Sequence, residues 1–173
     1  MNLIGIRARK ASEKKINTKM KNKVLNHFAK LIIKEKKFII SQNLKDLNYA
    51  KKKGLKENLI KRLHLNEVKL NEMTNSIFKI AKLKDPIDNT LKKWKRPNGL
   101  NIAKVSIPIG VIGVIYESRP NVTSDVASLC FKSGNVVILK GGSEALNSNR
   151  ALAKLFKKSL KKNKVDENFI QFI

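Results

Sequence analysis

Apolar residues recur every four positions early in the chain, a spacing that predicts an amphipathic helix. The stripe consists of Ile16, Met20, Val24, Phe28 and Ile32. Because one face carries all of these side chains, the helix is expected to bury that face in a core. The stripe indicates packing and carries no functional information.

Two further helices are predicted before residue 86. The first spans about residues 38–53 and ends at Gly54, since glycine readily adopts the left-handed conformation of helix ends. Asn66 is the expected N-cap of the second, and Asp85-Pro86 ends it, because proline disfavours helix in the residue before it. The positions that these two helices are expected to bury are Ile40, Leu44, Leu47, Leu70, Met73, Ile77 and Ile80.

The pattern changes after Pro86. Residues 94–99 read Trp-Lys-Arg-Pro-Asn-Gly and predict a turn, because proline fixes φ and glycine permits a positive φ. Residues 100–107 alternate loosely between apolar and polar and predict an extended arm. We therefore expect a turn and an arm over residues 87–107, between a helical part and the rest of the chain.

Strand and helix patterns alternate after residue 108. The run at 111–116 is apolar and rich in β-branched residues, which is typical of a strand buried on both faces. Asn121 or Thr123 is the expected cap of the next helix, and Gly134 its end. The remaining segments are a strand at 136–139, a helix at 145–161 and a strand at 169–173. This order predicts a parallel βαβαβ unit, so the fold class is α/β: N-terminal helices followed by a partial doubly wound, Rossmann-like sheet. A chain that stops within an apolar strand leaves an open sheet edge, so we expect a fragment of a longer polypeptide.

Two polar loops follow the first two predicted strands. They are Glu117-Ser118-Arg119-Pro120-Asn121 and Lys140-Gly141-Gly142-Ser143-Glu144, and each leads into a helix. Ligands of open α/β sheets bind at the carboxyl ends of strands, and the free amides of helix starts suit anions. Neither loop contains a Walker or G-x-G-x-x-G sequence. The residues alone therefore leave open both a nucleotide site and plain turns, with Arg119 paired to Glu117 and Asn121 acting as a cap.

The chain has a formal net charge of +25, which raises the alternative of a lysine-rich nucleic-acid-binding module. Only six of the 38 basic residues are arginine, and aromatic residues make up 6% of the chain. Surfaces that grip phosphates and stack bases use arginine and aromatic side chains, so a solvated lysine surface is the favoured interpretation and no specific nucleic acid is expected.

Few residues suit metal or disulfide chemistry. The chain has one cysteine, Cys130, and two widely separated histidines, His27 and His64, so no metal site and no internal disulfide are expected. No apolar run reaches the roughly 20 residues that cross a membrane, and the N-terminus lacks the apolar core of a signal peptide. We therefore expect a cytoplasmic protein without a membrane partner.

Two dense stretches resemble a known family. Residues 108–123 read Pro-Ile-Gly-Val-Ile-Gly-Val-Ile-Tyr-Glu-Ser-Arg-Pro-Asn-Val-Thr, and residues 129–145 read Leu-Cys-Phe-Lys-Ser-Gly-Asn-Val-Val-Ile-Leu-Lys-Gly-Gly-Ser-Glu-Ala. They resemble the signature segments of gamma-glutamyl phosphate reductases, in the aldehyde dehydrogenase superfamily. Weaker similarity precedes them at 43–47, 62–63, 85–86 and 96–100. The resemblance implies NADPH-dependent reduction of L-glutamyl 5-phosphate to glutamate 5-semialdehyde in proline synthesis.

The resemblance also implies roles for single residues. Asn121 matches the amide that helps form the oxyanion hole, and Lys140 matches the lysine that binds the adenosine ribose. Ser143 stands where NAD-preferring relatives often carry a glutamate, which agrees with use of NADP(H), although Glu144 lies close by. The other residues expected at the cofactor are Ser118, Arg119, Pro120, Gly141, Gly142 and Glu144.

The domain organisation follows from the same resemblance. Residues 1–86 are expected to be the helical part of the cofactor-binding domain, 87–107 a turn and oligomerisation arm of a homo-oligomer, and 108–173 a partial NADP-binding βαβαβ unit. The catalytic domain with its nucleophilic cysteine is expected to be absent, because Cys130 matches a helix position and is expected to be an inert buried thiol. The alternative within the superfamily is the cofactor domain of another aldehyde dehydrogenase.

Overall fold

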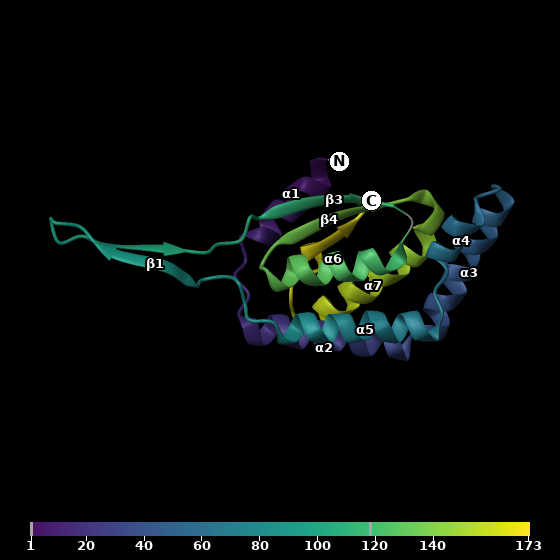
Figure 1. Ribbon diagram of the computed structural model, residues 1–173, viewed down its shortest axis with the longest axis horizontal. Helices are drawn as coiled ribbons and strands as arrows, with labels where there is room; N and C mark the ends of the chain where they lie inside the picture. Colours follow the sequence, from purple (N-terminus) through teal and green to yellow (C-terminus); the bar gives the residue numbers. More distant parts are fainter. Residues whose placement is uncertain (1, 118) are drawn as a thin grey trace.

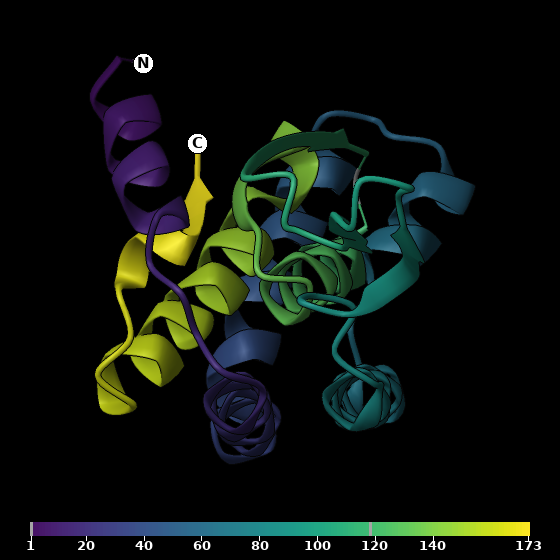
Figure 2. The same cartoon turned by 90° about the vertical axis from the view of Figure 1, so that its left-hand side faces the viewer.

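A three-stranded parallel sheet lies at the centre of the molecule, and helices cover both of its faces (Figure 1). The computed structural model describes residues 2–117 and 119–173. Helices α6 and α7 cover one face of the sheet, α1 lies against the other, and α2 and α5 form an outer layer on α6 and α7 (Figure 2). The helices are α1 (Asn2–Ser12), α2 (Thr18–Lys34), α3 (Lys36–Lys52), α4 (Glu57–Leu63), α5 (Glu67–Lys82), α6 (Pro120–Lys132) and α7 (Leu146–Lys162). The strands are β1 (Thr90–Lys95), β2 (Asn101–Val105), β3 (Val111–Tyr116), β4 (Val136–Gly141) and β5 (Ile170–Phe172), with short 3₁₀ turns η1 (Ser143–Ala145) and η2 (Glu167–Phe169).

The βαβαβ unit predicted from the sequence is confirmed. Strands β3, β4 and β5 pair in parallel in the order of the chain, with α6 and α7 as the connections. The prediction that residues 111–116 are buried on both faces is wrong. Ile115 is 84% exposed, because β3 lies at the edge of the described sheet, whereas β4 is central and buries Val136, Val137 and Leu139. The apolar pattern of β3 does not reveal which strand occupies the edge.

The predicted helices α2, α3 and α5 form, with one error in the buried faces. Asn66 caps α5 by accepting a hydrogen bond from the Lys69 backbone N–H, and Gly54 follows α3 with a φ of 68°. Leu44 was expected to be buried but is 52% exposed. The inward face of α3 instead carries Ile39, Asn43, Asp46, Leu47 and Ala50, so two polar side chains occupy part of the face that faces the protein.

Aromatic side chains join the two helical layers to the sheet. The ring centroids of Phe28 and Phe156 lie 4.7 Å apart, those of Phe131 and Phe156 lie 5.7 Å apart, and those of Phe131 and Phe169 lie 5.5 Å apart. These rings come from α2, α7, α6 and η2. The first pair is tilted and the other two are edge-to-face. Aromatic pairs favour defined geometries of this kind, so the cluster helps to fix the packing of the helical layers.

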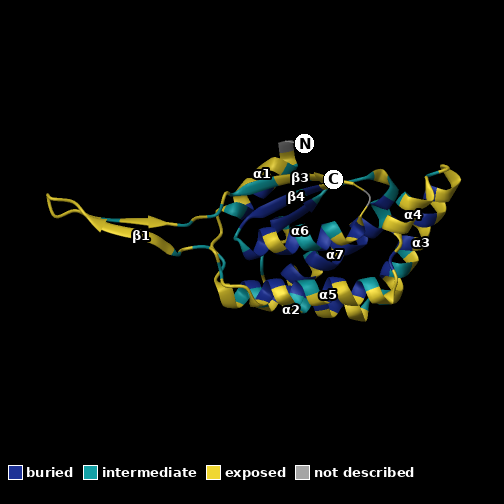
Figure 3. Ribbon diagram, viewed as in Figure 1, coloured by how far each residue is buried: buried dark blue, intermediate teal, exposed yellow. Residues whose placement is uncertain are grey.

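The segment predicted as a turn and arm is an antiparallel hairpin that projects from the body of the molecule (Figure 3). Every residue of β1 is exposed, and the Arg96 amide donates to the Leu100 carbonyl across the turn. The hairpin begins beside Asp85, which forms an ion pair of 2.9 Å with the buried Lys21. Strand β1 was not predicted, because its residues contact no core that would impose an apolar alternation.

Candidate functional site

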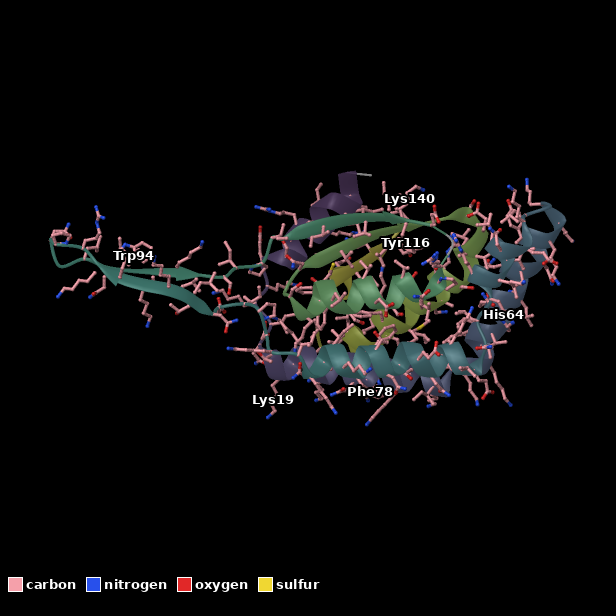
Figure 4. All side chains as sticks on the ribbon, in the orientation of Figure 1. Lys19, His64, Phe78, Trp94, Tyr116 and Lys140 are labelled. Carbon is pink, nitrogen blue, oxygen red and sulfur yellow. The ribbon has the colours of Figure 1, made fainter. Side chains whose placement is uncertain are left out.

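The two polar loops of the sequence lie at the same end of the sheet, where the carboxyl ends of β3 and β4 meet. Tyr116, the last residue of β3, pairs with Gly141, the last residue of β4. The loops that follow these residues therefore leave the sheet side by side. Figure 4 shows Tyr116 and Lys140 at this shared end. Parallel pairing in register therefore places the ends of β3 and β4, and the loops that follow them, at the same end of the sheet.

The first loop contains an ion pair other than the one considered from the sequence. Glu117 lies 3.9 Å from Arg62 of α4, and its backbone carbonyl accepts from the Arg119 amide at 2.8 Å. Arg119 is exposed and Pro120 is buried as the first residue of α6. Ser118, predicted to contact the cofactor, lies outside the described residues. Glu117 thus links this loop to the α4 region.

Asn121 lies within the first turn of α6 and is not its cap. Arg119 occupies the cap position, so the prediction that Asn121 or Thr123 caps the helix is wrong. Proline at the first helical position explains this shift, because its fixed φ begins the helix there. The Asn121 side chain is exposed, and its Nδ2 lies 3.4 Å from Asp125 Oδ2. One amide hydrogen is therefore directed toward Asp125, and the other can be donated elsewhere.

The second loop places polar groups in solvent and glycine against the protein. Lys140 and Ser143 are exposed, whereas Gly142 and Glu144 are half-buried. A methyl group on Gly141 would collide with the Asn149 side-chain amide and press on the Tyr116 ring. Gly141 is therefore required by the packing beneath the loop.

A polar network supports both loops from below. The Tyr116 hydroxyl lies 2.6 Å from Thr123 Oγ1, and Thr123 donates to Asn149 Oδ1 at 2.9 Å. Burial raises the pKa of Tyr116, which keeps its phenol protonated. The network connects β3, α6 and α7, the elements at whose ends the loops lie.

A buried carboxylate holds the start of α7. Asp46 of α3 is 2% exposed, and its oxygens accept from the backbone amides of Asn147 at 3.0 Å and Ser148 at 2.7 Å. It also accepts from the side chains of these two residues, and Asn43 donates to Ser148 Oγ at 3.0 Å. The sequence pattern did not predict that Asp46 binds the start of α7. The available signal was a polar pair, Asn43 and Asp46, on the helix face that carries Leu47.

A cavity of about 350 Å³ opens beside Asn121. It lies between α5 and the first turns of α6, with the end of α4 at its margin. Burial raises the pKa of Asp125 in this cavity, against the hydrogen bonds from Asn121 and Ser76. The polar side chains that line it are Arg62, Lys69, Glu72, Ser76, Asn121 and Asp125.

Cys130 lies away from the loops. Helix α6 starts at the carboxyl end of β3 and returns to the start of β4. A residue in its last turn therefore lies near the amino ends of the strands, away from the loops. Cys130 is buried, and its burial raises the pKa of the thiol. Because the thiolate is the reactive form, the raised pKa disfavours reaction at this thiol.

Within residues 2–117 and 119–173, no three histidine, cysteine, aspartate or glutamate side chains gather in a way that could hold a metal ion. None of the helices described there is long and apolar enough to cross a membrane.

The chain is similar to enzymes of a single name along almost its whole length. Gamma-glutamyl phosphate reductase of Aliarcobacter butzleri is 51% identical over 158 residues, which are 91% of this chain and 38% of the relative. The reductase of Clostridium botulinum is 44% identical over 99% of this chain and 42% of its own length. The chain thus spans about two-fifths of the curated relatives it matches. No family model matches it.

Solved structures agree in fold. The crystal structure of gamma-glutamyl phosphate reductase from Thermotoga maritima superposes with a TM-score of 0.95 at 39% identity, over 98% of this chain and 42% of that one. A probable aldehyde dehydrogenase from Listeria monocytogenes gives a TM-score of 0.66 at 14% identity, over 99% of this chain and 35% of that one. The second similarity identifies the aldehyde dehydrogenase fold.

Proposed function

We propose that this chain is the N-terminal part of a gamma-glutamyl phosphate reductase. It matches about two-fifths of the length of the curated reductases of that name. The identity of 44–51% to curated reductases, over nearly the whole chain, carries the proposal. The full enzyme would convert L-glutamyl 5-phosphate, NADPH and a proton into glutamate 5-semialdehyde, NADP⁺ and phosphate, in the cytoplasm and as a step of proline synthesis.

The residues at the paired strand ends fit a nicotinamide dinucleotide phosphate. Helix α6 begins at this end of the sheet, so the free amides of its first turn suit a phosphate. The first amides of α7 are already bound by Asp46. Lys140 and Ser143 are exposed and could hold the ribose and its 2′-phosphate. Arg119, Pro120, Gly141, Gly142 and Glu144 line the same two loops, and Ser118 belongs to this set by its place in the sequence. The cofactor, when bound, supplies the hydride.

Asn121 would act on the substrate. A thiolate from a segment beyond residue 173 would attack the acyl carbon, phosphate would leave, and the resulting thioester would accept the hydride. The Asn121 amide would donate to the acyl oxygen as it gains charge, while Asp125 holds the other amide hydrogen. Cys130 is not this nucleophile, because it is buried in the last turn of α6.

The projecting hairpin would serve as a contact between subunits of a homo-oligomer. Its exposed apolar residues support this role: Leu91 is 61% exposed, Trp94 40% and Leu100 57%. Apolar side chains on a projecting hairpin are costly in water and typical of surfaces that become covered.

A chimera tests the proposed reaction. It joins residues 1–173 to the C-terminal part of the Clostridium botulinum reductase, which follows the matched region. The matched region includes 99% of this chain. We expect the chimera to oxidise glutamate 5-semialdehyde in the presence of phosphate and NADP⁺, the reverse of the proposed reaction, measured by nicotinamide absorbance. A folded chimera without this activity would reject the proposed function.

Ser143→Glu in the chimera is expected to weaken NADPH binding far more than NADH binding. The added carboxylate would repel a 2′-phosphate by roughly 1–3 kcal/mol in a partly solvated site. Fluorescence titration with both cofactors measures the difference, and Ser143→Ala serves as the uncharged control. An equal loss for both cofactors would count against this position of the 2′-phosphate.

The chain of residues 1–173 alone is expected to have no reductase activity. Its only cysteine, Cys130, is buried and lies near the amino ends of the strands, away from the loops. The test mixes the purified chain with NADPH and glutamyl phosphate and follows nicotinamide absorbance, with the chimera as the positive control. Turnover that disappears in Cys130→Ser would overturn this expectation.

A further inference from the structure

The cavity beside Asn121 is lined by side chains of both charges, and none of the described residues proposed to hold the cofactor lines it. Helix α5 lines one wall through Lys69, Glu72 and Ser76, which follow one another at helical spacing on one face. Helix α6 lines the facing wall through Asn121 and Asp125. The cavity is therefore a short cleft with the proposed oxyanion donor at one point of its wall.

Asp125 lines the cleft, and one of its two carboxylate oxygens is buried beneath the surface of the cleft. Its Oδ1 has no hydrogen-bond partner among the described residues, whereas Oδ2 lies 3.4 Å from Asn121 Nδ2. Ser76 also lies close enough to the carboxylate to lower its pKa. A buried acceptor without a partner destabilises the folded protein, because it has lost its hydrogen bonds to water. A bound group that donates N–H hydrogens would remove this cost, and a cation would do so most strongly.

The cations at the margin differ in their availability. Lys69 Nζ already donates to the carbonyls of His64 at 2.7 Å and Lys61 at 3.2 Å. Arg62 is exposed, and among the described residues its one ion pair is the long contact of 3.9 Å with Glu117. Its planar guanidinium can therefore turn to a carboxylate ligand and bind it through two hydrogen bonds.

We propose that this cleft binds the amino-acid head of the substrate, with Asp125 accepting from the α-ammonium and Arg62 pairing with the α-carboxylate. The proposal rests on the function proposed above and names the residues that would select a glutamyl group. Asn121 and Asp125 are one helical turn apart, a separation of about 5–6 Å between their Cβ atoms. The two methylene groups of a glutamyl chain match this span, so the acyl carbon would lie at Asn121 while the ammonium reaches Asp125.

Two substrates that differ only in the amino group test the role of Asp125. The chimera is assayed with phosphate and NADP⁺ on glutamate 5-semialdehyde and on 5-oxopentanoate, which lacks the ammonium. Asp125→Asn is expected to lower kcat/KM for glutamate 5-semialdehyde by roughly 10- to 100-fold, the range for a hydrogen bond to a charged group. For 5-oxopentanoate, which leaves Asp125 without its cation in either protein, we expect little change.

Controls separate recognition from structure. Asp166→Asn changes a carboxylate that pairs with Lys14 in another part of the molecule, and the ratio of the two kcat/KM values should not move. Glu72→Gln tests the other carboxylate of the cleft. An equal loss on both substrates in Asp125→Asn would make Asp125 only a support for Asn121. The proposal would also be overturned if the ratio of kcat/KM for glutamate 5-semialdehyde to that for 5-oxopentanoate fell with Glu72→Gln but not with Asp125→Asn.

Calorimetry gives a readout that does not depend on turnover. L-Glutamate is expected to bind the chimera more tightly than glutarate, and Asp125→Asn should remove this preference. An inactive chimera that keeps the preference would reject the proposed reaction but support the cleft. An active chimera without the preference would reject the cleft and leave the reaction in place.

Discussion

Asn121→Ala in the chimera is expected to lower turnover by roughly 10²- to 10³-fold, the usual effect of removing one oxyanion donor. The acyl oxygen gains charge only as the thiolate attacks, so the lost hydrogen bond acts on the transition state. Steady-state kinetics at saturating cofactor and substrate measure this loss. Cofactor affinity should barely change, because the Asn121 side chain lies beside Asp125 and not in the loop after β4.

The helix itself should survive this substitution. Arg119, and not Asn121, occupies the cap position of α6, so circular dichroism and thermal unfolding of Asn121→Ala should match those of the parent chimera. If turnover persisted while the helix lost stability, Asn121 would have a structural role only.

Asp46→Ala is expected to destabilise the chain by on the order of 3 kcal/mol. Asp46 accepts from the backbone amides of Asn147 and Ser148 and from both of their side chains. The hydrogen bonds to Ser148 are buried and those to Asn147 are partly buried. Removal of the carboxylate leaves these donors without a partner and removes the cap of α7. Urea unfolding followed by circular dichroism measures the free energy of unfolding.

Two matched variants define the cause. Asp46→Asn keeps the shape of the side chain and one acceptor oxygen, so it should lower the free energy of unfolding by less than Asp46→Ala does. Asp166→Ala removes an aspartate that accepts from the Asn168 backbone amide near the surface, where water can replace it, and should cost less than Asp46→Ala. A loss below about 1 kcal/mol for Asp46→Ala would contradict the assignment, because that is less than the usual cost of a single unpaired buried donor.

Much of the layer structure could be predicted from the sequence because each element carries its own periodicity. Helix α7 buries Leu152, Leu155, Phe156 and Leu160, which recur on one face of the helix. The convergence of the two loops followed from a rule of parallel sheets that needs no side-chain detail. Helix α1 was not predicted, since it buries only the small residues Ala8 and Ala11 and leaves Leu3 and Ile6 exposed.

The features that the sequence did not predict depend on distant partners. The burial of β3 depends on its neighbours in space. Ile115 is exposed although the sequence of β3 is typical of a central strand. The cap of α7 comes from Asp46, about 100 residues earlier, so no local pattern around α7 reveals it. Asp125 similarly looks like a solvated helix residue until α5 is placed beside it.

The contact between α3 and α7 also sets an order of events during synthesis. Helix α3 leaves the ribosome long before Ser148, so Asp46 stays without its partners until α7 has emerged. Loops of this length close slowly, because the entropic cost must be met before the distant contact forms. The face of α3 that packs on α7 would therefore stay exposed to water on the nascent chain, with Asp46 hydrated, until α7 has emerged.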